Sequence, residues 1–154
     1  MDGASMGDHL ASAKAVYEAE LLSRWGQPNG AAESETRELE SRLGLKLPAA
    51  YLEFLRWMGN HTRGPFAGTD MFIGDIAPNT EYAREFFDEH DLGAFPTDGL
   101  CFYSHQGYIL GWLRVSADPN PECFFVGETS REIAHGGRFA DFIKQSIERA
   151  CRRA

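Results

Sequence analysis

The chain has 154 residues, 43% of them hydrophobic and 12% aromatic, so it is long and apolar enough to fold as one domain around its own core. Its 23 Asp and Glu residues outnumber its 15 Lys and Arg residues, which gives a formal net charge of -8. A field of this sign repels nucleic acid and anionic lipid, so we expect neither as a direct partner. The negative charge favours a basic partner, although a requirement for solubility alone would explain the charge equally well.

The three cysteines, Cys101, Cys123 and Cys151, are odd in number and widely spaced. This usage fits a reducing compartment better than a disulfide framework. The N-terminal residues include acidic side chains where a signal peptide would have Lys or Arg, and the apolar runs are too short to span a bilayer. We therefore expect a cytoplasmic protein that does not act at a membrane.

Two helices are predicted in the first 44 residues. The first runs from a cap at Asp8 to about Arg24, because apolar residues recur there at helical spacing. The second begins near Ser34 and ends at Gly44, since glycine adopts a left-handed backbone at low cost. The polar stretch at 27–32 separates them as a loop.

A third helix is predicted to restart at Pro48, because the fixed φ angle and the missing N–H of proline suit the first helical position. It should run to about Met58 and close at Gly59. Most of its circumference is apolar, which leaves mainly Glu53 and Arg56 for solvent. We expect it to be the most buried helix.

Residues 71–76 resemble a short strand, and a helix should follow within 77–93. Three aromatic residues of that helix, Tyr82, Phe86 and Phe87, are predicted to face inward. Its outer face is acidic and carries Glu81, Glu85, Asp88, Glu89 and Asp91. This acidic face is the first candidate binding surface, although a solvated outer face is the simpler explanation for each residue alone.

Three short apolar runs separated by turn residues, at 100–103, 108–115 and 122–126, predict antiparallel strands. A last helix is predicted across 138–150, where Phe and Ile residues fall on one face. Helices first, then a mostly antiparallel sheet and a closing helix describe an α+β domain.

One stretch of the sequence combines a helix stop, a Leu-Pro restart and regularly spaced apolar residues. Its defining residues are Leu39-Glu40, Leu43-Gly44, Leu47-Pro48, Tyr51, Leu55 and Gly59. Their joint spacing resembles the signature of the SUKH superfamily, also called the SMI1/KNR4 family. The second half is similar to the same family through Gly107, Trp112, the strand at 123–126, Ile133-Ala134, Phe139 and Phe142-Ile143. The resemblance covers residues 33–147, so we expect a helical extension at 1–30 packed on a SUKH-like domain at 31–154.

Bacterial members of this superfamily are mostly immunity proteins, which bind and neutralise a toxin domain delivered by neighbouring cells, and many of those toxins attack nucleic acid. The resemblance therefore implies stoichiometric binding of a basic toxin domain, with no enzymatic activity and no cofactor. Fungal members act in cell-wall regulation and signalling. A regulatory adaptor that binds a resident protein is thus the second hypothesis, and the chain is expected to be a monomer or a weak dimer.

Loops held by a sheet often carry recognition residues, so the hairpin region is the second candidate binding surface. It contributes Asp98, Tyr103, His105, Asp118 and Glu122, of which the tyrosine and the histidine flank a turn and are expected to be exposed. Tyr108 and Trp112 should share one face of their strand, and we expect them to pack in the core.

A small hydrolase is the third hypothesis. Cys101 and His105 straddle the predicted turn and could act as nucleophile and base, with His90 and His135 as other candidate bases. No third group or oxyanion hole is evident, and a cysteine in an apolar strand is usually a small core residue. The five histidines are dispersed, so the sequence predicts no zinc site.

Overall fold

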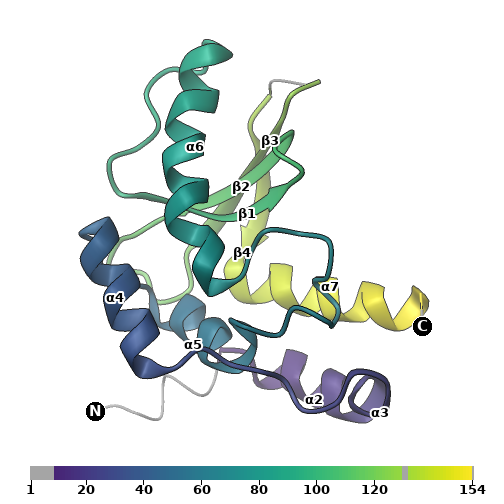
Figure 1. Cartoon of the computed structure of the whole chain (residues 1–154). Helices are drawn as coiled ribbons and strands as arrows, with labels where there is room; N and C mark the ends of the chain where they lie inside the picture. The colour runs from purple at the N-terminus through teal and green to yellow at the C-terminus, as the bar shows by residue number, and fades with distance from the viewer. Residues whose placement is uncertain (1–8, 130–131, 154) are drawn as a thin grey trace.

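The computed structural model describes residues 9–129 and 132–153, which form helices around an antiparallel sheet (Figure 1). The helices are α2 (Ala11–Glu20), α3 (Leu22–Trp25), α4 (Glu33–Leu43), α5 (Ala49–Met58), the 3-10 turn η1 (Ile73–Asp75), α6 (Ile76–Glu89) and α7 (Phe139–Arg153). The strands are β1 (Gly99–His105), β2 (Ile109–Arg114), β3 (Glu122–Gly127) and β4 (Ala134–Arg138). This arrangement confirms the α+β prediction. The predicted helix cap, Asp8, lies outside the described residues.

The four strands pair in chain order, β1-β2-β3-β4, and every pair is antiparallel. The three predicted strands are confirmed, whereas the sequence did not predict β4. Its sequence, AHGGR, has neither the alternating apolar residues nor the β-branched residues that indicate a strand. Pairing with β3 therefore defines β4, and the strand lies at one edge of the sheet.

The pairing of β1 with β2 contains a bulge between Cys101 and Tyr103. A bulge adds one residue to a strand and so interrupts the alternation of side chains between the two faces. As a result, Phe102 and Tyr103 both contact Phe142 of α7, at ring-centroid distances of 5.6 Å and 6.2 Å. The face to which each later residue of β1 points is therefore reversed relative to simple alternation.

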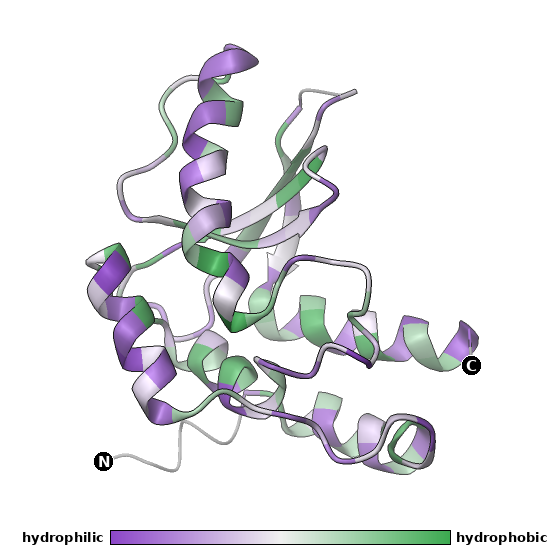
Figure 2. Ribbon diagram, in the orientation of Figure 1, coloured by the Kyte–Doolittle hydropathy of each residue, from purple (hydrophilic) through white to green (hydrophobic). Residues whose placement is uncertain are grey.

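Two hydrophobic clusters lie on the two faces of the sheet. The larger one joins buried residues of α2, α5 and α7 to residues of β1, β2 and β3, including Phe54, Phe102 and Phe139. The smaller one joins α6 and the loop that follows it to Leu110 and Trp112 of β2. Figure 2 shows hydrophobic residues along α5 and α7 and long hydrophilic stretches on α4 and α6.

The break between α4 and α5 follows the predicted chemistry. Gly44 has a left-handed backbone with φ 67°, and the N–H of Leu45 donates to the carbonyl of Glu40 at 3.2 Å. The Glu40 carboxylate also accepts the N–H of Leu47 at 2.8 Å. Pro48 then precedes the first residue of α5. The predicted helix stop and restart are confirmed. Pro48 occupies the N-cap position, one residue before the first helical position at which it was predicted.

The strand predicted at 71–76 is wrong. This segment enters η1 and then α6, which begins at Ile76. Side chains tie it into helical turns, because the carboxylate of Asp75 accepts the N–H of Phe72 at 3.1 Å and the amide of Asn79 donates to the carbonyl of Asp70 at 2.6 Å. Such local side-chain bonds compete with strand formation.

Glu53 was predicted to face solvent, but it is only 5% exposed. Its carboxylate accepts the N–H of Leu10 at 3.2 Å and forms an ion pair with Lys14 of α2 at 3.1 Å. The prediction failed because α2 packs over this side of α5, which periodicity within α5 alone does not reveal. A buried carboxylate needs such partners, so Glu53 fixes where α2 begins.

A second polar contact between α2 and the rest of the chain centres on His61, which is 8% exposed. The N–H of Asn29 approaches Nδ1 at 3.2 Å, so Nδ1 must be the unprotonated nitrogen. The proton on Nε2 then points to the hydroxyl of Tyr17 at 3.2 Å, and that hydroxyl donates to the carbonyl of Gly26 at 2.7 Å. The network assigns His61 to its neutral form.

This network predicts a loss of stability in mild acid. Burial lowers the pKa of His61 below its usual value, so the unfolded chain binds a proton that the folded chain does not. Stability should therefore be lost as the pH falls below about 6.5 toward the lowered pKa. Urea unfolding at pH 7.5 and pH 5.5 measures the change, and the His61→Gln variant should show a smaller one. An equal change in both proteins would contradict the assignment.

Candidate protein-binding surface

The acidic face of α6 points to solvent as predicted. Glu81, Glu85, Asp88 and Glu89 are exposed, while Phe86 and Phe87 of the same helix are buried. Asp91 follows the helix and is also exposed, so all five predicted acidic residues lie in one continuous segment. Within residues 9–129 and 132–153, none of these five carboxylates forms an ion pair. Their charge is therefore available to a partner.

Tyr82 was predicted to face inward but is 38% exposed. Its hydroxyl donates to the carbonyl of Gly107 at 2.9 Å, which ties α6 to the turn between β1 and β2. Partial burial raises the pKa of Tyr82, and the negative charges of Glu89, Glu128 and Glu85 raise it further. Glu128, directly after β3, thus belongs to the same acidic region as α6. The sequence did not reveal it, because 39 residues separate it from Glu89, the nearer of the other two along the chain, and only the fold brings them together.

Three carboxylates of the hairpin region are already paired. Asp98 forms a two-point ion pair with Arg114, at 2.8 Å and 3.2 Å. Asp118 pairs with Arg138, and Glu122 pairs with His135. Exposed pairs of this kind add little stability, but each arginine offsets the charge of its aspartate, and His135 occupies the Glu122 carboxylate as a hydrogen-bond partner. The structure therefore separates these three residues from the unpaired carboxylates of α6.

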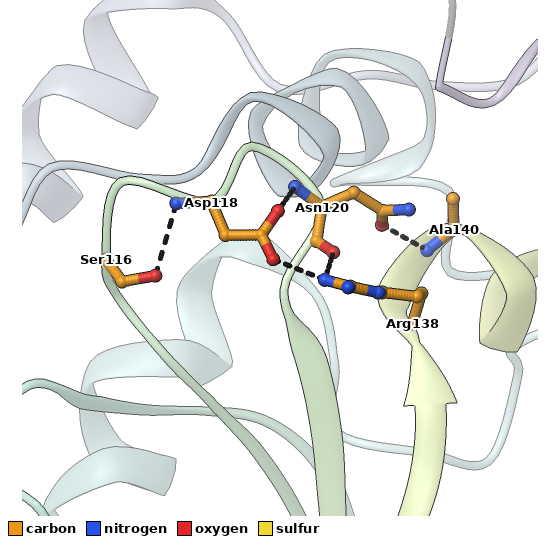
Figure 3. A network of polar contacts seen from close by, with 5 residues as sticks. All are labelled: Ser116, Asp118, Asn120, Arg138 and Ala140. Carbon is orange, nitrogen blue, oxygen red and sulfur yellow. Dashed lines mark hydrogen bonds and ion pairs between the residues drawn. The ribbon is translucent and has the colours of Figure 1, made fainter.

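Asp118 belongs to a polar network that shapes the loop between β2 and β3 (Figure 3). Its carboxylate accepts the N–H of Asn120 at 2.9 Å, and Arg138 donates to the same carboxylate and to the Asn120 carbonyl. The Asn120 side chain accepts the N–H of Ala140 at 2.9 Å. The bond from the Asn120 N–H, with the help of Arg138, lowers the pKa of Asp118. The network joins this loop to the first turn of α7.

The bond from Arg114 also lowers the pKa of Asp98, so this carboxylate stays charged at neutral pH. The pair joins the residue before β1 to the last residue of β2. Both Asp98 and Asp118 therefore have a structural explanation that does not require a partner protein. Their role in recognition stays a prediction.

Neither Tyr103 nor His105 is exposed as expected; both are partly buried. Tyr103 packs against Phe125 and Phe142, because the bulge in β1 turns it toward α7. The prediction for Tyr108 is also wrong, since this residue is 40% exposed and contacts His105 edge to face at 5.5 Å. Trp112 is buried as predicted.

The cysteine proposed for a hydrolase is not an activated nucleophile. Cys101 is fully buried, and burial raises its pKa to about 12, so the thiol stays protonated at neutral pH. Its Sγ donates to the carbonyl of Tyr103 at 3.3 Å. Cys101 is thus placed as a small core residue under α6.

Within residues 9–129 and 132–153, no group of three or more His, Cys, Asp or Glu side chains could hold a metal ion. In the same part of the chain, no helix combines the length and the apolar composition needed to cross a bilayer.

Comparison with known protein families agrees with the resemblance found in the sequence. The model of the SMI1 / KNR4 family (SUKH-1) matches residues 30–145, which include α4 to β4 and the first half of α7. No curated protein matches the chain at a significant level. The match covers most of the chain and both the helical and the sheet portions, so the chain belongs to the SMI1/KNR4 (SUKH-1) family.

Proposed function

We propose that this protein is an immunity protein that binds a basic toxin domain, of nuclease type, and neutralises it in a stoichiometric complex. Membership of the SUKH-1 family supports a role in protein binding. The observation that carries the proposal is the set of exposed, unpaired carboxylates on α6, led by Glu85, Asp88 and Glu89.

A nuclease must hold phosphate groups, so its active cleft is basic. An acidic helix can block such a cleft, and its field can also raise the association rate by about 10- to 1,000-fold. Speed matters for an inhibitor that must reach the toxin before its substrate does. The three cysteines, all free thiols, suit action in a reducing cytoplasm.

Co-expression tests the proposal. We expect a toxin domain to be encoded next to this gene. It should stop growth when expressed alone, and co-expression of this protein should restore growth. The two proteins should then purify together in a fixed ratio. Growth arrest that persists despite co-expression would overturn the proposal, and capture of a resident cellular protein in its place would support the regulatory adaptor.

A further inference from the structure

The sheet is covered unequally on its α6 side. α6 packs on β1, where the hydroxyl of Thr80 accepts the N–H of Cys101 at 3.0 Å. Phe87 extends this contact to Trp112 of β2, with ring centroids 5.1 Å apart. The described part of the chain places no helix over β3 and β4 on this side, and Figure 1 shows these strands beside α6 and not beneath it.

A row of aromatic rings crosses from the covered half to the open half. Trp112 pairs with Phe124, and Phe124 pairs with His135 in the neighbouring strand. The first two rings stack at 5.8 Å, and the last two meet edge to face at 5.2 Å. Exposure increases along the row, from the buried Trp112 to His135, whose side chain is 69% exposed. The core on this side therefore continues into an open apolar face.

Two large apolar side chains beside the open face are exposed, Tyr108 at 40% and Ile133 at 44%. Tyr108 ends the turn between β1 and β2 and follows Gly107, to which Tyr82 of α6 donates a hydrogen bond. Ile133 directly precedes β4, and continuing the alternation of that strand by one residue places it on the same side as His135. At the opposite end, a hollow of about 400 Å³ lies over Phe124, and most of its other lining residues are polar or charged, among them the ion-paired Arg114 and Arg138. A sheet face with exposed apolar residues is normally covered by another layer.

We propose that this half-face, defined by Tyr108, Phe124, Ile133 and His135, is where the partner docks, and that its occupant is an apolar segment of the toxin domain with Lys or Arg residues at its margin. This proposal rests on the proposed function. The charge around the face selects the occupant: Glu85, Glu89 and Glu128 all act on Tyr82 beside the face. The net charge of -8 disfavours a second copy of this chain. The apolar face would anchor the complex, and the carboxylates would guide the partner to it.

The test uses the purified toxin domain encoded next to this gene. Tyr108→Ala and Ile133→Ala should each weaken binding by at least about tenfold, mainly through faster dissociation. The double variant should weaken it further. Both residues are exposed, so thermal unfolding should stay close to that of the wild type. Ser23→Ala on α3 and Gln145→Ala on α7, at exposed positions on other helices, serve as controls and should bind normally.

The outcomes separate this proposal from the function on which it rests. If the wild-type protein binds the toxin and both variants bind equally well, the docking face is wrong while the proposed function stands. If the wild-type protein does not bind, both fall together. Sedimentation of the protein alone tests the other occupant, since a dimer that Ile133→Ala dissociates would assign the face to a second copy and overturn the proposal.

Discussion

Replacing Phe102 by alanine should lower the free energy of unfolding by about 3–5 kcal/mol, because the change removes a large buried side chain and leaves a cavity. Phe102 is fully buried where the sheet meets α5 and α7. Its ring lies 5.3 Å from that of Phe139, 5.6 Å from Phe142 and 6.4 Å from Tyr51. Both α5 and α7 therefore lose contacts at once, and a close-packed core does not collapse fully into such a gap.

Thermal and urea unfolding would measure this loss. For a chain of this size, the expected free-energy change lowers Tm by roughly 6–20 °C. Tyr108→Ala is the matched control, since it removes an aromatic ring of similar size from an exposed position in the same hairpin. A loss for Phe102→Ala no larger than that of the control would show that Phe102 is not central to the core.

The helical half of the fold could be predicted from sequence because its signals are local. Gly44 ends α4 and Pro48 precedes α5 through backbone properties that these residues carry in any context. Burial of Phe86, Phe87 and Phe139 likewise follows from periodicity within one helix. Most features that depend on one element at a time were therefore predicted correctly, and the exceptions are the exposed Tyr82 and the helical turns at 71–76.

Features that depend on contacts between distant segments could not be predicted in this way. β4 exists because β3 pairs with it, and Glu53 is buried because α2 packs over α5. The bulge in β1 determines that Tyr103 packs against α7. No pattern of alternation shows where such an extra residue is inserted.

The same difference between local features and long-range contacts applies to the candidate site. The acidity of α6 could be read from consecutive residues, and the structure places those residues in solvent. The side chains that pair with Asp98, Asp118 and Glu122 come from other strands, 16, 20 and 13 residues away. The sequence therefore predicted eight candidate carboxylates on two surfaces without showing which of them are paired, whereas the fold leaves the five of α6 and its C-terminal end unpaired among the described residues.

Reversing the charge of Glu85, Asp88 and Glu89 together to lysine should slow association with the adjacent-gene toxin domain by about tenfold or more at low salt. The three residues are exposed and form no ion pair within residues 9–129 and 132–153, so the fold should tolerate the change. Because the lost attraction is long-range, the association rate should also depend less on ionic strength. Stopped-flow mixing at several salt concentrations measures both effects.

A control variant must separate the position of the charges from their sum. Glu18, Glu20 and Glu38 are exposed on α2 and α4, and converting all three to lysine changes the net charge by the same amount. If α6 guides the partner, this control should associate faster than the α6 variant and keep more of the salt dependence. Equal rates in the two variants would mean that only the net charge matters, and the acidic face of α6 would then have no specific part in recognition.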